Sequence, residues 1–391
     1  MRLLHTADWH LGRTLHGASL LEAQATVLDQ LIELVSSERP DAVIVAGDIF
    51  DRAYPPLAAV ELFDDTVTRL AATRVPIVIT SGNHDSAVRL GMNARVAEAA
   101  GVHIRTRLDR IAEPIEVSSG TERALIYGVP YLDPPSSAGP LEALQPSHAG
   151  VLGAAVGQIV ADRESRSADF VVVAAHGVVA GGQPVGEHGG GVERSIDVGG
   201  VAAVPRELFA GIDYAAMGHL HHPQGLGERV RYSGAPLAFC FDEAGDKKSV
   251  ALVTLCAGAA PAVELIPTPQ PRAMARLRGT LDELLADPAH TAAEQAWVEA
   301  TLTDRLRPKL AMERLRGRFP HVLKLAHEPV RDARDGAEQA QSYGERVRGR
   351  TELEVAERFL AEVREGTEAD AEEHALLQAA FEAFGREEAL R

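Results

Sequence analysis

Five short clusters of histidine, aspartate and asparagine interrupt the first 221 residues, and each follows an apolar run of strand length. The clusters are Asp8-Trp9-His10, Gly47-Asp48-Ile49-Phe50-Asp51, Gly82-Asn83-His84-Asp85, His176-Gly177 and Gly218-His219-Leu220-His221. In an open α/β sheet the carboxyl ends of the parallel strands meet at one edge, where ligands bind. We therefore expect the five clusters to converge on one crevice.

The apolar runs alternate with amphipathic stretches over residues 1–265, which predicts a layered α/β fold. The expected strands are 3–6, 42–46, 77–80, 124–129, 170–175 and 214–217, and the expected helices are 20–37, 57–72 and 147–165. Two later segments, 229–232 and 250–255, are expected to add antiparallel strands. Segments 134–146 and 181–191 are predicted to be long loops.

Three prolines within residues 267–271 mark a linker, because proline cannot continue a helix or a central strand. After it, strands at 273–279, 296–303 and 322–326 with helices at 281–285 and 305–319 predict a small α+β module. From residue 351 onward, acidic helices with apolar stripes are expected. The sequence thus divides into regions 1–265, 266–345 and 346–391.

The composition excludes several classes of protein. Two cysteines in 391 residues argue against a disulfide scaffold. The apolar runs are far shorter than the roughly 20 residues that span a bilayer, and no apolar leader follows Met1, so we expect a cytoplasmic protein without membrane contact. The net charge of −17 argues against binding of polyanions through the overall field. Only residues 266–335 are net basic.

Metal binding is the chemistry that the five clusters predict best. Two divalent ions side by side need a bridging carboxylate with nitrogen and oxygen ligands around them. The candidate ligands are Asp8, His10, Asp48, Asn83, His176, His219 and His221. Imidazole and carboxylate without thiolate favour Mn, Fe or Zn over Ca or Mg alone. Each cluster alone is compatible with a turn, but five in this order are difficult to explain by turn chemistry.

This series of motifs resembles that of the calcineurin-like metallophosphoesterases and, more closely, that of the SbcD family of DNA-repair nuclease subunits. The segments that carry the resemblance are 5–12, 46–51, 82–86, 217–221 and 232–236, together with 241–243, 247–250, 269–271 and 351–353. The resemblance implies a layered α/β sandwich with a small α+β capping domain and a C-terminal helical tail. It also implies a phosphodiesterase that uses two Mn²⁺ ions, with Mg²⁺ or another divalent ion as a possible substitute.

The resemblance assigns roles to single residues. It implies one ion held by Asp8, His10, Asp48 and His221, and a second held by Asp48, Asn83, His176 and His219, with Asp48 bridging. His84 matches the catalytic histidine of the family, not a ligand, and histidine is suited to donate a proton near neutral pH. Apart from the resemblance, Asp85 either orients His84 or caps a turn, and we expect the turn cap because adjacent side chains rarely face each other. Archaeal and eukaryotic relatives carry a histidine where this chain has Asp51, so no second assisting histidine is expected.

The resemblance further implies a role within a DNA-repair complex. The expected activities are 3′–5′ exonuclease on double strands and endonuclease on single strands and hairpins, in repair, replication and recombination. The expected partners are DNA, the ATPase SbcC, whose ATP hydrolysis would regulate cleavage, and a second copy of this chain. Region 346–391 would dock on the coiled-coil base of SbcC. The basic residues 305–318 either contact DNA or form a solvated helix face.

Two other functions remain open from the sequence. A phosphoesterase that acts on small molecules would need the same metal site, but it would not need the linker, the basic module or the docking tail. An adaptor subunit with little catalysis of its own would need the tail, but not a complete set of ligands and His84. Both alternatives are therefore less favoured than a nuclease.

Overall fold

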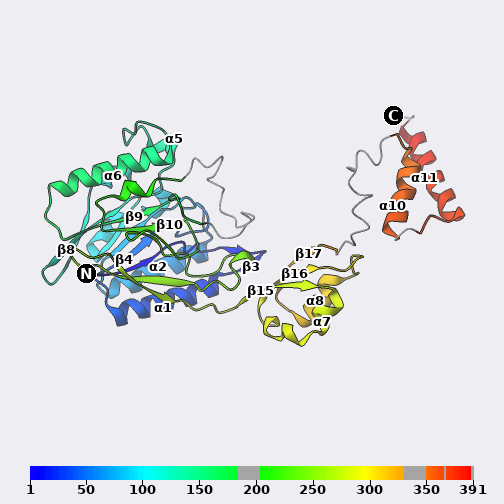
Figure 1. The fold of residues 1–391 in the computed structure, drawn as a ribbon, viewed down its shortest axis with the longest axis horizontal. Helices are drawn as coiled ribbons and strands as arrows, with labels where there is room; N and C mark the ends of the chain where they lie inside the picture. Colours follow the sequence, from blue (N-terminus) through cyan, green and yellow to red (C-terminus); the bar gives the residue numbers. More distant parts are fainter. Residues whose placement is uncertain (184–202, 330–348, 365–366, 389–391) are drawn as a thin grey trace. The chain divides into compact units, whose positions relative to one another are not determined.

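The computed structural model describes residues 1–183, 203–329, 349–364 and 367–388, and the chain divides into two compact units, 1–328 and 329–391 (Figure 1). Most of the predicted loop 181–191 lies outside the described residues. The first unit contains two six-stranded sheets and a smaller three-stranded sheet. The expected layered α/β architecture, with a small α+β module and C-terminal helices, is confirmed. The division at residues 265 and 345 stays a prediction.

The first sheet has the strand order β14-β13-β1-β4-β5-β6. Its strands are β1 (Arg2–Thr6), β4 (Ala42–Ala46), β5 (Ile77–Thr80), β6 (Val102–Arg105), β13 (Ser249–Thr254) and β14 (Ala262–Pro267). Strands β1, β4, β5 and β6 are parallel, whereas β13 is antiparallel to β1 and to β14. The sequence did not predict the two edge strands β6 and β14.

The second sheet has the order β11-β12-β10-β9-β8-β7. Its strands are β7 (Ile115–Ser119), β8 (Glu122–Gly128), β9 (Phe170–His176), β10 (Tyr214–Gly218), β11 (Gln224–Leu226) and β12 (Val230–Tyr232). The expectation of an antiparallel strand at 229–232 is wrong in part, because β12 runs parallel to β10 and antiparallel only to β11. The chain reverses twice, through β11, and so regains the direction of β10.

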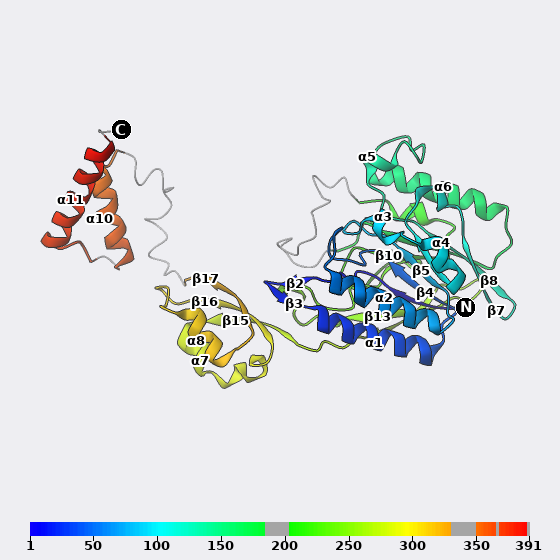
Figure 2. The ribbon, with the colours of Figure 1, turned by 180° about the vertical axis from the view of Figure 1, so that it is seen from behind.

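The two sheets lie face to face between helices. Helices α1 (Leu21–Glu38) and α2 (Leu57–Ala72) cover the first sheet, and α6 (His148–Glu164) covers the second (Figures 1 and 2). The layer between the sheets is apolar at positions such as Leu3, Ile44 and Val172. Strand β4 is buried on both faces, which explains its uninterrupted apolar sequence.

Shorter elements connect these layers. They are β2 (Thr14–Leu15), β3 (Ala18–Ser19), α3 (Ala87–Leu90), α4 (Ala94–Ala97) and α5 (Pro134–Ser137), with 3₁₀ turns η1 (Glu98–Ala100), η2 (Leu108–Arg110), η3 (Arg206–Phe209), η4 (Phe241–Glu243) and η5 (Pro288–Ala293).

The small module is a parallel sheet in the order β15-β16-β17 with two helices. Its elements are β15 (Met274–Gly279), α7 (Leu281–Ala286), β16 (Trp297–Leu302), α8 (Ala311–Arg318) and β17 (Val322–His327). The predicted basic helix 305–319 is wrong at its start, because α8 begins only at Ala311. Pro308 disfavours helix in the residue before it, and Leu310 has a left-handed backbone with φ of 53°.

The second unit contains helices α10 (Glu352–Val363) and α11 (Ala371–Glu388), which pack against each other. Thr351 and Glu354 form a capping box at the start of α10, and Arg364 donates to Glu373 at 2.7 Å. None of the side chains described in these two helices is buried. Among the helices of the described residues, none is both long enough and apolar enough to cross a membrane.

Gly82 follows β5 and lies against the residue Asp48, which follows β4, and this close contact leads to a prediction. A Cβ atom on Gly82 would overlap the backbone nitrogen and carboxylate of Asp48, whereas a Cβ on Gly157 in α6 would meet open space. We expect Gly82→Ala to lower the free energy of unfolding by about 1–3 kcal/mol through overpacking. Gly157→Ala is the control and should raise it by up to about 1 kcal/mol, because alanine favours helix. Urea unfolding followed by circular dichroism measures both, and equal stabilities would contradict the prediction.

Candidate metal centre

The loops that follow β1, β4 and β5 of the first sheet and β9 and β10 of the second meet at one edge of the sandwich. Backbone hydrogen bonds join two of these loops: Asp8 N donates to Gly47 O at 3.1 Å and His10 N donates to Asp48 O at 3.0 Å. The carboxylate of Asp8 in turn accepts the backbone N–H of His219 at 2.9 Å. The first and second sheets are therefore tied together at the site.

The backbone at the site is strained. Four of the candidate ligands have positive φ: Asp8 (55°), His10 (43°), Asp48 (48°) and His219 (106°). Residues other than glycine rarely adopt such angles, and those that do cluster at functional sites, where the surrounding structure holds them. Four such residues at one edge of the sandwich are typical of a functional site.

Asp8, His10 and His221 form one group whose potential ligand atoms lie within 4.8 Å of one another. The two Nε2 atoms of His10 and His221 are 3.1 Å apart, and all three side chains are buried. Burial lowers the pKa of His10 well below its usual value, so its imidazole is neutral and able to coordinate. Two imidazole nitrogens and a carboxylate at these distances could hold a divalent ion.

Asp8, Asp48 and His176 form a second such group. His176 Nδ1 donates to the carbonyl of Ala46 at 2.9 Å, which leaves Nε2 as the atom that faces the site. Asn83 Oδ1 lies 2.9 Å from this Nε2 and 3.2 Å from Nδ1 of His219. Thus Asn83 and His219, the two candidates outside the clustered groups, adjoin the second group.

The carboxylate of Asp48 lies between the two groups. Its Oδ2 is 3.6 Å from His10 Nε2 and 3.4 Å from His176 Nε2, is buried, and has no hydrogen-bond partner among the described residues. Its Oδ1 accepts the backbone N–H of His84 at 2.9 Å. This orphaned oxygen between two imidazoles fits a bridging position for two cations.

The electrostatic environment also suits cations. Burial would raise the pKa of Asp48, but the neighbouring His176 holds it below its usual value, so the carboxylate stays charged. Although burial opposes it, the negative charge of Asp48 raises the pKa of His176 to about 9. Buried carboxylates are unfavourable unless positive charge compensates them. The donor set therefore fits divalent metal ions.

His84 lies beside the groups in a defined orientation. Its Nδ1 donates to the backbone carbonyl of Asp51 at 2.8 Å, and its Nε2 is buried without a partner among the described residues. Its ring meets that of His10 edge to face, with 4.8 Å between the centroids. A potential ligand atom of His84 also lies within 4.8 Å of those of His10 and Asp48. His84 is thus close enough to act on a group bound at the site.

Asp85 joins the loops after β4 and β5. Its carboxylate accepts backbone N–H groups from Gly82 (2.9 Å), Ile49 (3.0 Å) and Phe50 (2.9 Å). Burial and the charge of Asp48 raise the pKa of Asp85 to about 7, against the effect of these three donors. The bond to Gly82 is the expected turn cap, and the other two were not expected from the sequence.

Sequence reasoning also missed a buried ion pair behind His221. Glu243 Oε1 accepts from His221 Nδ1 at 3.2 Å, and Lys248 Nζ lies 2.5 Å from Glu243 Oε2. Both residues belong to segments that resemble the SbcD family, but no local pattern assigned them a role. His222 is exposed, and His5 is buried against Tyr214 in the core, so neither joins the site.

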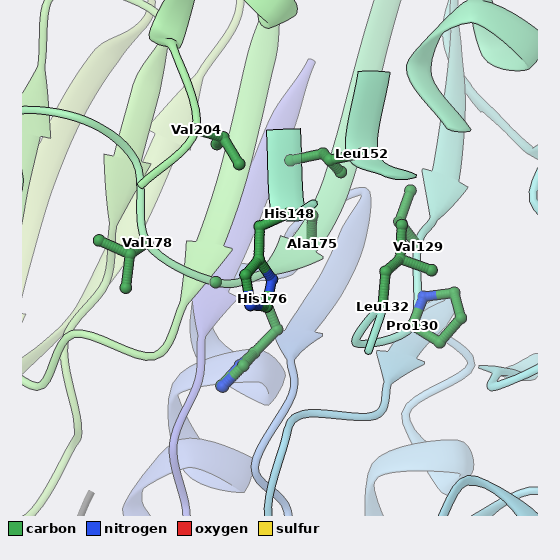
Figure 3. Close-up of a pocket in the computed structure, with 10 residues that line it drawn as sticks. Val129, Pro130, Leu132, His148, Leu152, Ala175, His176, Val178 and Val204 are labelled. Atoms are coloured by element: carbon green, nitrogen blue, oxygen red, sulfur yellow. The ribbon is translucent and has the colours of Figure 1, made fainter. Parts of the chain in front are cut away.

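A small pocket adjoins His176 on the side of α6 (Figure 3). It is lined by Val129, Pro130, Leu132, His148, Leu152, Ala175, His176, Gly177, Val178 and Val204. His148 and His176 are the only residues with polar side chains in this lining. The metal centre is therefore bordered by apolar side chains on this side.

Solved structures with a similar arrangement are remote in sequence. TT1561 of Thermus thermophilus is 12% identical and matches 68% of this chain and 98% of its own, with a TM-score of 0.39. The calcineurin-like phosphoesterase YfkN from Bacillus subtilis is 13% identical and matches 68% and 90%, with a TM-score of 0.37. Likenesses of this size do not bear on the family assignment.

Sequence relatives are closer. Residues 1–223 match the calcineurin-like phosphoesterase family, and residues 270–364 match the family described as type 5 capsule protein repressor C-terminal domain, or SbcD_C. The SbcD component of nuclease SbcCD from Rhodobacter capsulatus is 38% identical over 308 residues, which are 73% of this chain and 75% of that protein. The chain therefore belongs to the SbcD nuclease family within the calcineurin-like phosphoesterases, enzymes that hydrolyse phosphodiester bonds with divalent metal ions.

Proposed function

We propose that this chain is a DNA nuclease that uses two divalent ions, with Mn²⁺ preferred. The proposed ligands are Asp8, His10, Asp48, Asn83, His176, His219 and His221, with Asp48 shared by both ions. The observation that carries the proposal is the buried Oδ2 of Asp48, 3.6 Å from His10 Nε2 and 3.4 Å from His176 Nε2, with no hydrogen-bond partner among the described residues. Imidazole with carboxylate, and no thiolate, favours Mn, Fe or Zn over Ca or Mg alone, and the choice of Mn²⁺ among these follows the resemblance to the SbcD family.

Two ions at this site would activate water and neutralise charge on the phosphate. Side chains of the protein supply the other parts of the reaction, namely proton donation and the positioning of the loops. The hydrogen bond from His84 Nδ1 to the carbonyl of Asp51 fixes the ring and leaves Nε2 directed away from that carbonyl. Protonated at Nε2, His84 can give its proton to the departing 3′ oxygen as general acid. Asp85 holds the loops that carry Asp48 and His84 at a constant distance.

We further propose that the chain cleaves double strands from their 3′ ends and also cuts hairpins and single strands. Its relative is named as the SbcD component of the SbcCD nuclease, and we infer that this chain likewise assembles with SbcC, whose ATP hydrolysis would regulate cleavage in repair, replication and recombination. A cytoplasmic location follows from that role. The same reasoning supports three functional regions, a nuclease domain at 1–265, a capping domain at 266–345 and a docking region at 346–391.

The helices α10 and α11 are the proposed docking surface for SbcC. Large apolar side chains on them are exposed, among them Phe359 (63%), Val363 (51%), Leu376 (67%) and Phe384 (57%). No described side chain of the pair is buried, so two short helices have little core of their own. An amphipathic helix with an unsatisfied apolar face typically binds an apolar groove of a partner.

The small module is the proposed second contact for DNA, with fewer basic residues than the sequence suggested. Arg314 pairs with Asp282 at 2.7 Å and Arg318 pairs with Glu294 at 3.1 Å, so both are engaged within the module. Arg307, Lys309 and Arg316 are exposed. Phosphate contacts by these three side chains would make DNA binding weaken with rising salt.

A second copy of the chain is the proposed partner for exposed apolar side chains before and at the start of α2 and in and after α3, here called the apolar patch. The patch comprises Tyr54, Leu57, Val88, Met92 and Val96, each more than 70% exposed. The guanidinium of Arg89 lies 4.1 Å from the centroid of the Tyr54 ring, so the segments before α2 and in α3 are neighbours. Large exposed apolar side chains on neighbouring segments typically mark a protein interface.

The test of the proposed nuclease is cleavage of an end-labelled hairpin and a linear duplex in Mn²⁺ or in EDTA. We expect cleavage only with Mn²⁺, and none by Asp48→Ala. His84→Ala should retain binding of Mn²⁺ and DNA but cleave roughly 10²-fold to 10⁴-fold more slowly, the usual contribution of a general acid. His222→Ala, which changes the exposed neighbour of His221, should cleave like the wild type.

Other outcomes would select among the alternatives. Unchanged cleavage by His84→Ala would overturn the role of His84. Hydrolysis of a small phosphate ester without any cleavage of DNA would favour the small-molecule phosphoesterase, and binding of Mn²⁺ and DNA without hydrolysis of either would favour the adaptor.

The proposed dimer predicts that charged side chains introduced into the apolar patch will separate the two copies. We expect the wild type to be a dimer by light scattering and Val88→Glu/Met92→Glu to be a monomer, because two carboxylates would have to be desolvated in the interface. Leu144→Glu is the control, since Leu144 is fully exposed outside the patch. A wild type that is monomeric at all concentrations would refute the dimer.

If α10 and α11 bind SbcC, charged substitutions on their apolar face should abolish that binding. We expect Phe359→Glu/Leu376→Glu to lose co-purification with SbcC, because it places charge on the apolar face, whereas Mn²⁺-dependent cleavage by the isolated chain stays unchanged. Arg358→Gln, on the exposed polar face, serves as control. Retained co-purification by the double variant would show that SbcC binds elsewhere.

A further inference from the structure

The side chain of Glu243 is one of the few fully enclosed carboxylates of the described chain, and each of its oxygens has two partners. Oε1 accepts from His221 Nδ1 at 3.2 Å and from Cys240 Sγ at 3.3 Å. Oε2 accepts from the backbone N–H of Phe239 at 3.3 Å and lies 2.5 Å from Lys248 Nζ. Glu243 is 2% exposed and Lys248 likewise 2%. Such enclosure fixes the direction of the carboxylate.

Lys248 completes the arrangement from the other side. Besides Glu243, its Nζ donates to the backbone carbonyl of His221 at 3.2 Å and lies 3.5 Å from Asp246 Oδ2. Lys248 therefore contacts both the carboxylate that binds His221 and the main chain of His221 itself. The ion pair and the histidine form one unit.

The consequence for His221 is a defined orientation. A carboxylate that accepts from Nδ1 leaves the lone pair on Nε2, and Nε2 is the atom that lies 3.1 Å from His10 Nε2 in the first group. A histidine that binds a metal commonly donates its other nitrogen to a carboxylate, which orients the ring and increases its basicity. We propose that Glu243 and Lys248 are positioning residues that hold His221 in its metal-binding orientation.

This inference rests on the proposed function, because it takes His221 to be a metal ligand. Glu243 and Lys248 lie in the segment after β12, outside the five strand-end clusters that supply the ligands. Their role is to support one ligand of one ion. The second ion, near His176 and Asn83, does not involve His221 and should be unaffected.

The test is titration of the metal-free protein with Mn²⁺ by calorimetry. The wild type should bind two ions, and Glu243→Gln should bind one of them at least tenfold more weakly, within the roughly 10-fold to 100-fold range typical of such supporting residues. The absorption spectrum of bound Co²⁺ gives a second readout, since loss of His221 from the coordination shell changes the bands. Glu243→Gln should shift the spectrum toward that of His221→Ala.

A second variant keeps the inference testable in case Glu243→Gln does not fold. Removing one member of a buried ion pair leaves an uncompensated charge, so Lys248→Met alone is a poor test. Glu243→Leu/Lys248→Met removes both charges and retains similar volumes, and it should weaken the same ion by at least as much as Glu243→Gln. Thermal melting of the metal-free variants establishes that they are folded.

Glu299→Gln is the matched control. Glu299 is 5% exposed and pairs with Lys324 at 2.5 Å and with Arg276 at 2.9 Å. Arg276 also binds Asp242, the neighbour of Glu243, at 2.9 Å. Glu299→Gln thus removes the charge of a second buried glutamate that pairs with a lysine but does not contact His221, and it should bind both ions like the wild type.

The outcomes separate this inference from the proposed function. Binding of both ions within twofold of the wild type by Glu243→Gln and by the double variant would overturn the positioning role and leave the metal centre standing. A wild type that binds no Mn²⁺ would overturn the metal centre and this inference together. An equal loss of affinity in Glu299→Gln would assign the effect to general disturbance of the fold and overturn the positioning role.

Discussion

The buried carboxylate of Asp48 is the constraint on which the site depends. It lies at the edge where the two sheets meet, with one oxygen on the backbone of His84 and the other between His10 and His176. A charged group in that position is unfavourable unless cations or cationic side chains compensate it. The residues Asp8, His10 and Asp48 have positive φ, and hydrogen bonds join their loops, so this backbone holds Asp8 and His10 close to that carboxylate.

Support for the site comes from beyond the two sheets. Three consecutive residues of η4 face three different neighbours: Phe241 stacks on His16 with 5.6 Å between the ring centroids, Asp242 binds Arg276 in β15, and Glu243 binds His221. Trp297 of the small module packs into the same apolar cluster as Phe241. The small module therefore contacts the segment that holds His221 through Trp297 and Arg276.

The sequence predicted those features of the site that a local pattern of residues encodes. Polar residues that follow apolar runs identified the seven candidate ligands, because parallel strands must end at a common edge. The edge strands β6 and β14 were missed, because β6 has only four residues and β14 has no buried residue, so neither shows the uninterrupted apolar run of a buried strand. The start of α8 was wrong because helix ends carry weak local signals. The sequence contains Glu243 and Lys248, but their contacts with His221 depend on the path of the segment after β12, which brings both residues close to the site. The spacing of residues along the sequence does not predict such a path.

The acidic composition gains a physical explanation from this arrangement. A chain with a net charge of −17 repels a polyanion over most of its surface. Carboxylates such as Asp8 and Asp48 concentrate negative charge at the crevice, and divalent ions bound there would reverse the local sign where the phosphate must lie. The two exposed apolar surfaces, on α10 with α11 and on the patch that includes Met92, do not depend on charge at all. In the proposed function, apolar surfaces would recognise the partners and metal ions would recognise the phosphate, so an acidic protein could act on a nucleic acid with attraction confined to the place of hydrolysis.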